Sequence, residues 1–236
     1  PHKKMRDCVW TMIRHVHKLR VFERSRCGLM LKIAVIGLQG AVSEHIVMVR
    51  QALQNMGIEG SAVWADQPEE LSGVHGVIIP GGESTTIGKL MQRTGTFEVV
   101  RRLGESGVPI MGTCAGLILL AKKGDEQVVR TGQPLLGLMD MEVVRNAFGR
   151  QRESFETDVR VEGLKGGPFR GVFIRAPAVE RVWGEARVVA EVEGRIVGVR
   201  QGKLLALSFH PELTDDTRLH EHFLELCRGG RPGASL

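Results

Sequence analysis

A single cysteine stands between two glycines where two apolar runs meet, within residues 108–120. An apolar run, the motif Gly-Thr-Cys-Ala-Gly centred on Cys114 and a second apolar run indicate a buried strand, a tight turn and a helix. Gly112 and Gly116 fit this geometry because a side chain at either position would collide where strand and helix meet closely. In Gly-x-Ser-x-Gly enzymes the same elbow presents a nucleophile, and a helix N-terminus favours the reactive thiolate. The alternative is that Cys114 is a small buried apolar residue, as free cysteines often are.

A histidine and a glutamate two residues apart could complete such a site. His210, Pro211 and Glu212 follow the apolar run 204–209, which predicts another buried strand. In extended chain, alternation places the side chains of His210 and Glu212 on the same side, and Pro211 keeps His210 away from helical angles. A carboxylate beside a histidine fixes its tautomer and supports the imidazolium, as in a nucleophile–base–carboxylate triad. The alternative is a structural histidine with satisfied hydrogen bonds.

Strands and helices alternate through the first half of the chain. Four apolar segments read as strands: 31–37, 61–65, 74–79 and 108–113. Helical patterns between them predict an α/β fold, with a mostly parallel central sheet and helices on both faces. Ligands bind beyond the carboxyl ends of the strands in such sheets. Three glycine-bearing turns are expected at that edge: 37–41, 80–86 and 112–116.

The turn at 80–86 has the composition of a ligand-binding loop. Gly81 and Gly82 would let backbone N–H groups approach a ligand, and Ser84 is expected to cap the helix that follows. The alternative is an ordinary turn between strand and helix. Neither the Gly-x-Gly-x-x-Gly fingerprint nor a P-loop is present in the sequence, which argues against a nucleotide site.

The second half of the chain has a different pattern, beginning near residue 135. Five short segments read as strands: 138–144, 155–161, 171–174, 188–192 and 196–199. Glu193 and Gly194 are typical of a hairpin turn. These strands predict an antiparallel or mixed addition to the sheet, and a final helix is expected over 216–227.

Charge is distributed unevenly along the 236 residues, whose formal net charge is +5. Residues 1–29 carry eight Lys or Arg against two acids, a charge of +6, whereas the rest carries 24 against 25, a charge of −1. The body therefore gives no electrostatic reason to expect nucleic acid. The N-terminal segment has apolar residues at helical spacing, so it could be a membrane-surface or targeting element. We expect instead a poorly ordered extension (1–29), a catalytic domain (30–228) and a flexible tail (229–236).

Cysteine usage and hydropathy indicate in which cellular compartment the protein is expected. The four cysteines, Cys8, Cys27, Cys114 and Cys227, form no C-x-x-C pair and suggest neither a zinc site nor a disulfide framework. A reducing, cytoplasmic location is expected. No apolar run approaches the roughly 20 residues of a membrane span, so no membrane partner is expected.

Six sequence blocks occur in an order that resembles one family. They are Gly-Leu-Gln-Gly-Ala (37–41), Pro-Gly-Gly-Glu-Ser-Thr (80–85), Gly-Thr-Cys-Ala-Gly-Leu (112–117), Arg-Asn-x-Phe-Gly-Arg-Gln (145–151), Gly-Val-Phe-Ile-Arg-Ala-Pro (171–177) and Ser-Phe-His-Pro-Glu-Leu-Thr (208–214). From Met30 to about Cys227 the chain resembles the glutaminase subunits of pyridoxal 5'-phosphate synthase, which are class I triad glutamine amidotransferases with a flavodoxin-like fold. The elbow and His-x-Glu are shared by all such glutaminases. The first, fourth and fifth blocks are narrower and point to the vitamin B6 branch.

The resemblance implies a role for each matching residue. Cys114 would attack the side-chain amide of L-glutamine, His210 would transfer the proton, and Glu212 would orient His210. Backbone N–H groups of Ala115, Gly81 and Gly82 would form the oxyanion hole. The implied glutamine-binding residues are Gly81, Gly82, Glu83, Arg145, Ile174 and Arg175.

The resemblance also implies a partner. Ammonia would pass to a barrel-shaped synthase subunit, and Gln39 lies in the turn that senses this partner. No cofactor and no metal are expected. From the residues alone, a guanidinium such as that of Arg145 or Arg175 suits an α-carboxylate because it binds two oxygens, although either could be an ordinary surface arginine.

Two other functions stay open at this stage. A cysteine hydrolase or peptidase could use the same elbow, and glutamine turnover would separate it from a glutaminase. A non-catalytic module could bind or regulate a partner, although such a module needs neither the cysteine, the histidine nor the glutamate.

Overall fold

Five parallel strands form one half of the main sheet in the computed structural model, which describes residues 30–149 and 153–229. In spatial order they are β2 (Gly60–Ala65), β1 (Leu31–Ile36), β3 (Gly76–Ile79), β4 (Ile110–Thr113) and β12 (Leu204–Leu207). Every neighbouring pair in this half is parallel. The predicted α/β fold with a mostly parallel sheet is confirmed.

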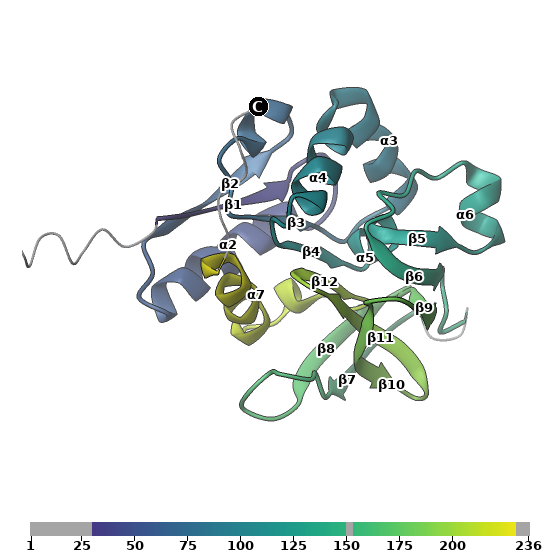
Figure 1. The fold of residues 1–236 in the computed structure, drawn as a ribbon. Coiled ribbons are helices and arrows are strands. Elements are labelled where there is room, and N and C mark those ends of the chain that lie inside the picture. Colours follow the sequence, from purple (N-terminus) through teal and green to yellow (C-terminus); the bar gives the residue numbers. More distant parts are fainter. Residues whose placement is uncertain (1–29, 150–152, 230–236) are drawn as a thin grey trace, which may run out of the picture. The chain divides into compact units, whose positions relative to one another are not determined.

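Helices cover both faces of this half of the sheet (Figure 1). They are α2 (Val42–Asn55) and α7 (Arg218–Arg228) on one face, and α3 (Ser84–Thr94) and α4 (Thr96–Glu105) on the other. The alternation of β1 explains the two layers, because successive side chains of a strand point to opposite faces. Ile33 and Val35 belong to the core beneath α2 and α7, while Ala34 and Ile36 belong to the core beneath α3 and α4.

The other half of the sheet is mixed. Beyond β12 it continues through β11 (Arg195–Gln201), β9 (Ala178–Val182), β6 (Met139–Val144) and β5 (Ala121–Gly124), and β10 (Arg187–Val192) also pairs with β11. The pairs β12–β11, β11–β9 and β9–β6 are antiparallel, as expected for an added region. Glu193 and Gly194 both have positive φ, which suits the tight hairpin turn predicted between β10 and β11. The sequence reading missed β9, β5 and the short helix α6 (Glu126–Thr131).

One predicted pairing is wrong. The strands β7 (Ser154–Val159) and β8 (Phe169–Ile174) do not extend the main sheet but form a separate two-stranded antiparallel sheet. Aromatic packing and a backbone hydrogen bond join this hairpin to the segment after β12. Within the hairpin the rings of Phe155 and Phe173 stack with centroids 4.7 Å apart, and Phe173 contacts Phe209, just after β12, at 5.4 Å. The N–H of His210 donates to the carbonyl of Val172 in β8 at 2.8 Å.

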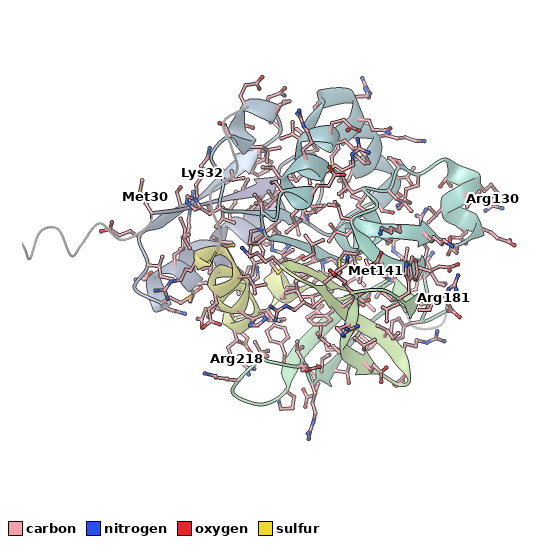
Figure 2. The ribbon with its side chains drawn as sticks, viewed as in Figure 1. Met30, Lys32, Arg130, Met141, Arg181 and Arg218 are labelled. Atoms are coloured by element: carbon pink, nitrogen blue, oxygen red, sulfur yellow. The ribbon has the colours of Figure 1, made fainter. Side chains whose placement is uncertain are left out.

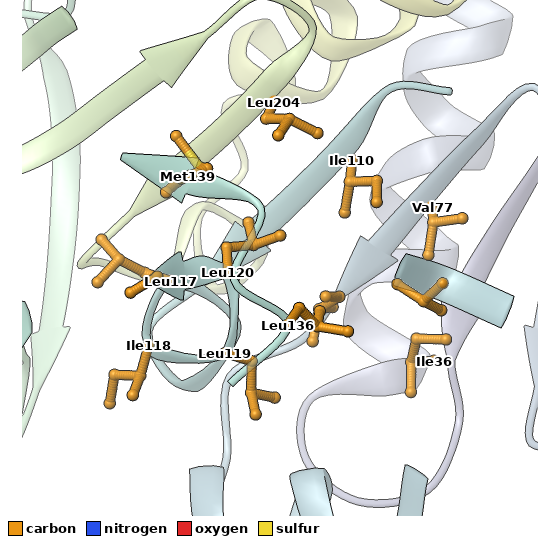
Figure 3. Close-up of a cluster of buried hydrophobic side chains, with 14 of the residues drawn as sticks. Ile36, Val77, Ile110, Leu117, Ile118, Leu119, Leu120, Leu136, Met139 and Leu204 are labelled. Atoms are coloured by element: carbon orange, nitrogen blue, oxygen red, sulfur yellow. The ribbon is translucent and has the colours of Figure 1, made fainter. Parts of the chain in front are cut away.

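A short helix, α5 (Ala115–Leu120), runs through the core between β4 and β5. All six of its residues are buried, as expected for a helix that is apolar on every side. Figure 3 shows Leu117, Leu119 and Leu120 among side chains from the sheet, including Ile110 of β4 and Leu204 of β12. Cys114, which directly precedes α5, is therefore attached to a helix that packs on all sides in the core.

Charged side chains lie at the periphery of the described domain, for example Arg130 and Arg181, whereas Met141 of β6 is buried (Figure 2). Two short 3₁₀ helices, η1 (Pro68–Leu71) and η2 (Pro211–Leu213), complete the fold. Among the described residues, no helix has the length and apolar character needed to cross a membrane. The expectations for the extension at 1–29 and for most of the tail, 230–236, lie outside the described residues.

Candidate active site

Cys114 occupies a strained elbow between β4 and α5. Its φ of 49° and ψ of −98° lie outside the regions that residues other than glycine prefer. The predicted role of the flanking glycines is confirmed. A Cβ on Gly112 would lie 2.5 Å from the carbonyl of Gly116, and a Cβ on Gly116 would lie 2.2 Å from the carbonyl oxygen of Ile79. Close packing thus fixes the backbone that presents the Cys114 thiol.

The predicted histidine and glutamate meet the cysteine at the carboxyl edge of the sheet. His210 Nδ1 lies 2.7 Å from Glu212 Oε1, and both side chains are buried. Cys114 is close enough to the ring of His210 to raise the pKa of that histidine, and both residues line one cavity. The Cys114 sulfur lies 4.0 Å from the carbonyl oxygen of Ile174. Three segments that are distant in sequence therefore bring a sulfur, an imidazole and a carboxylate together at one site, where the imidazole and the carboxylate are hydrogen-bonded.

The surroundings favour the charged form of His210. Burial lowers its pKa, but the hydrogen bonds to Cys114 and Glu212 outweigh burial and raise the pKa to about 10. Burial also raises the pKa of Glu212, yet His45 and His210 more than offset this, so the pKa of this carboxyl falls below its ordinary value. At neutral pH, His210 is an imidazolium beside an ionised Glu212. That is the state in which a histidine can support a thiolate.

The loop after β3 lies against the catalytic histidine. A Cβ on Gly81 would lie 2.2 Å from Cε1 of His210, so the ring packs directly on the backbone of Gly81. The first turn holds this loop in place. The N–H of Ala41 donates to the carbonyl of Gly81 at 3.1 Å, and the N–H of Glu83 donates to Oε1 of Gln39 at 2.9 Å. The two turns predicted to share one edge of the sheet are therefore hydrogen-bonded to each other.

The prediction that Ser84 caps α3 is wrong, because the N-cap is Glu83. The Glu83 carboxylate accepts from the backbone N–H of Thr85 at 3.1 Å and of Thr86 at 2.6 Å. Burial raises the pKa of Glu83, but hydrogen bonds from Thr86 and Thr85 outweigh it and lower the pKa. Ser84 is buried, and its hydroxyl donates to Gln133 Oε1 at 3.0 Å.

A cavity of about 350 Å³ opens in front of the triad. Most of the predicted site residues line it: Gln39, Gly82, Glu83, Cys114, Ala115, Arg145, Ile174, Arg175 and His210. Gly81 and Glu212 are not among its lining residues, and both contact the ring of His210. Ala115 is the first residue of α5, where backbone N–H groups have no intrahelical acceptor.

Opposite charges face each other at one wall of the cavity. Nη2 of Arg145 lies 3.3 Å from Oε1 of Glu83, and Nη1 of Arg145 donates to Gln133 Oε1 at 3.3 Å. Asn146 and Arg175, which also line the cavity, have φ values of 51° and 42°. Backbone strain of this kind clusters at functional sites. Sequence analysis did not predict Asn146 as a site residue, although it lies in the block 145–151, and it did not predict Gln133, which contacts Arg145 from the loop after α6.

The fold and these site residues define a class of protein. It is the class I glutamine amidotransferase type, an α/β fold with a cysteine at a strand–helix elbow and a His–Glu pair. The chain belongs to the SNO glutamine amidotransferase family, whose model matches residues 35–229.

Individual relatives agree with this assignment. The chain is 54% identical over 196 residues to the "Pyridoxal 5'-phosphate synthase subunit PdxT" of Thermococcus onnurineus, covering 83% of this chain and 98% of the relative. It is 54% identical over 198 residues to the protein of the same name from Pyrococcus furiosus, with the same coverage. A solved structure described as a glutamine amidotransferase superposes with a TM-score of 0.73 at 49% identity, covering 83% of this chain and 98% of that one.

Proposed function

We propose that the chain hydrolyses L-glutamine to L-glutamate and ammonia and supplies that ammonia to pyridoxal 5'-phosphate synthesis. The observation that carries the proposal is the hydrogen-bonded pair of His210 and Glu212 beside Cys114, with Cys114 and His210 at the wall of one cavity that a single amino acid could occupy. The relatives named as pyridoxal 5'-phosphate synthase subunits support the pathway.

The chemistry follows from the positions of these groups. The Cys114 thiolate attacks the side-chain amide carbon, and the C=O electrons move to the oxygen of a tetrahedral intermediate. As the C–N bond breaks, His210 gives its proton to the departing nitrogen, and ammonia leaves a thioester. Neutral His210 then takes a proton from water, whose oxygen attacks the thioester carbon. Cleavage of the C–S bond releases glutamate and restores the thiolate–imidazolium pair, while Glu212 holds the ring throughout.

Backbone donors would stabilise the oxyanion. The N–H of Ala115 lies at the start of α5, beside the sulfur, and the Gly81–Gly82 loop lies against the same cavity. Removing one such donor typically raises the barrier by about 2.7–4 kcal/mol. At rest, Gln39 and Gly40 hold the loop, because a Cβ on Gly82 would lie 2.5 Å from Oε1 of Gln39. This contact supports a sensing role for the first turn.

The charged wall of the cavity suits a zwitterion. Glu83 and Arg145 are neighbours of opposite sign, so one could bind the α-ammonium and the other the α-carboxylate of glutamine. Ile174 and Arg175 also line the cavity, and the backbone of Arg175 is strained, with a φ of 42°.

The partner in this proposal is the barrel-shaped synthase subunit, which receives the ammonia directly. The expected compartment is the cytoplasm, consistent with the two cysteines in the described part of the chain, Cys114 and Cys227, both of which are unpaired.

The test measures ammonia and glutamate from glutamine, using the full chain with and without the synthase subunit. We expect turnover that rises when the subunit is present, and loss of about 10³-fold or more in Cys114→Ala. A glutamine-like electrophile should label wild type at Cys114 and leave the variant unlabelled. Unchanged ammonia release by Cys114→Ala would refute the proposal. Peptide cleavage without glutamine turnover would favour the peptidase alternative, and a catalytically silent chain that still binds the subunit would favour the non-catalytic module.

A further inference from the structure

A string of buried polar side chains continues behind the triad. The second carboxylate oxygen of Glu212, Oε2, lies 3.3 Å from Nε2 of His45 on α2. The other ring nitrogen of His45, Nδ1, lies 3.0 Å from Nε2 of His220 on α7. His45 and His220 are both fully buried. Helices from one face of the sheet thus reach the carboxylate that orients the catalytic histidine.

The hydrogen-bond pattern selects the tautomers. Neither Glu212 Oε2, which lies 3.3 Å from Nε2 of His45, nor Nδ1 of His220 has a hydrogen-bond partner of good geometry among the described residues. If His45 carried its proton on Nδ1, the bare Nε2 would face a carboxylate oxygen, and Glu212 would keep an unpaired charged atom in the core. A proton on Nε2 of His45 is within reach of that oxygen at 3.3 Å as well as of the Thr113 hydroxyl at 3.1 Å, and His220 then donates from its own Nε2 to Nδ1 of His45. The atom left unpartnered is the bare nitrogen of His220, which costs less than a buried charged oxygen without a donor.

His45 and His220 are both neutral at neutral pH, so each contributes a hydrogen-bonding dipole rather than a charge. Burial lowers the pKa of His45, and burial followed by the repulsion of His45 lowers the pKa of His220 to about 3. The titratable groups that face His45 are Glu212 from η2, His210 just before it, His220 from α7 and Glu44 on its own helix. Among the described residues, no group of three or more His, Cys, Asp or Glu side chains has the arrangement of a metal site. The string therefore works by hydrogen bonding.

We propose that His45, supported by His220, is a positioning residue for Glu212: it donates from Nε2 to the carboxylate oxygen that His210 does not use. Two donors on two oxygens fix the rotation of the carboxylate, and a fixed carboxylate fixes the ring of His210 against Cys114. Nε2 of His45 also lies 3.1 Å from the hydroxyl of Thr113, which adjoins the nucleophile. The proposal rests on the glutaminase function above, because the experiments that test it measure the activity of the triad.

Two amide substitutions that differ by one methylene separate positioning from packing. In His45→Gln the amide reaches the place of Nε2 and can donate to Glu212, whereas in His45→Asn it reaches only the place of Nδ1 and can contact His220. We expect His45→Gln to keep kcat within about threefold of wild type and His45→Asn to lose about 10- to 100-fold, with KM little changed. We also expect the alkaline limb of the pH profile to move to lower pH in His45→Asn, because a misplaced Glu212 supports the imidazolium of His210 less well.

His75 provides the matched control. It is also buried, with Nδ1 accepting from the N–H of Lys32 at 3.1 Å, but it precedes β3 and so lies at the opposite edge of the sheet. His75→Gln and His75→Asn should leave both kcat and the pH profile of the triad unchanged. Equal losses in His45→Gln and His45→Asn would overturn the proposal, because the missing ring rather than the missing donor would then be responsible. Wild-type kcat in both His45→Gln and His45→Asn would overturn the proposal as well.

A measurement on the unmodified chain decides the matter if His45→Asn fails to fold. Nitrogen-15 NMR of the imidazoles should find the proton of His45 on Nε2 and that of His220 on Nε2. A proton on Nδ1 of His45 would reverse the donation and overturn the proposal. If wild type releases no ammonia from glutamine, the proposed function fails, whereas the tautomer result still reports on the contact between His45 and Glu212.

Discussion

Replacing Gly81 with alanine should remove activity without removing the fold. The added Cβ would lie 2.2 Å from Cε1 and 2.8 Å from Nδ1 of His210, whereas ordinary contact begins at about 3.4 Å. The ring must therefore move by roughly 1.2 Å. Gly81 does not have a positive φ, so alanine fits its backbone. The N–H that would contribute to the oxyanion hole is kept, and the perturbation is confined to the histidine.

Such a displacement is costly for catalysis and moderate for stability. Moving a catalytic group by about 1 Å can lower the rate by about 10²-fold, and the ring cannot retreat freely because Nδ1 is held 2.7 Å from Glu212 Oε1. We expect kcat for ammonia release, measured with the synthase subunit present, to fall about 100-fold. The clash is with a side chain that can shift, so the free energy of unfolding should fall by only about 1–2 kcal/mol.

A matched control is Gly229→Ala at the end of α7, where the nearest atom to the new Cβ is 4.0 Å away. This variant should match wild type in both rate and urea midpoint. Wild-type kcat in Gly81→Ala would show that the ring of His210 does not need its present position. Loss of rate accompanied by a collapsed urea midpoint would show that the clash falls on the backbone instead.

Two further predictions concern charge and packing. The pKa of His210, about 10 in the folded chain against an ordinary 6.5, should appear in an NMR titration and should fall in Cys114→Ala, which removes one of its causes. Because the folded value is the higher one, this contribution to stability is complete below about pH 6.5 and is lost as pH rises through about 10; an equally steep loss in Cys114→Ala would contradict the assignment. In Gly116→Ala the new Cβ would lie 2.2 Å from a backbone oxygen of Ile79, and neither backbone can move away easily. We expect a loss of about 1–3 kcal/mol in urea unfolding, and stability equal to wild type would refute the close-packing argument.

The site residues that could be predicted from the sequence are those whose role depends on their near neighbours in the chain. The glycines around Cys114 are needed because strand and helix nearly touch, and that need is visible in the five residues 112–116. His210 and Glu212 do pair as predicted, but the predicted reason is wrong: Pro211–Leu213 form the 3₁₀ helix η2 after β12 has ended, not extended chain. Parallel topology then predicted that the three turns would meet, and the hydrogen bond between Gln39 and Glu83 confirms that two of them do.

The missed features depend on partners that are distant in sequence. His45 lies 175 residues from His220, and within an amphipathic helix it reads as one more core position beside Ile46. Ser84 is the residue type that usually caps a helix, but Glu83 is one residue closer to the strand, and its longer side chain folds back to both N–H groups. These outcomes follow from side-chain reach and tertiary packing, which residue type alone does not encode.

The pairing of the hairpin β7–β8 also could not be inferred. Its alternation predicts strands but not their neighbours, and the hairpin is attached through the contact of Phe173 with Phe209 and the backbone hydrogen bond from His210 to Val172. The strand β5 was missed for a different reason. It follows α5 with no connecting residue, so the apolar run gives no sign of where helix ends and strand begins.

That seamless connection divides the active site into a fixed part and an adjustable part. Cys114 leads straight into α5, and α5 leads straight into β5, so the nucleophile has no slack on either side. We therefore expect an outside molecule to tune reactivity through the turns 37–41 and 80–83, which are joined to each other by hydrogen bonds rather than to the nucleophile by continuous chain.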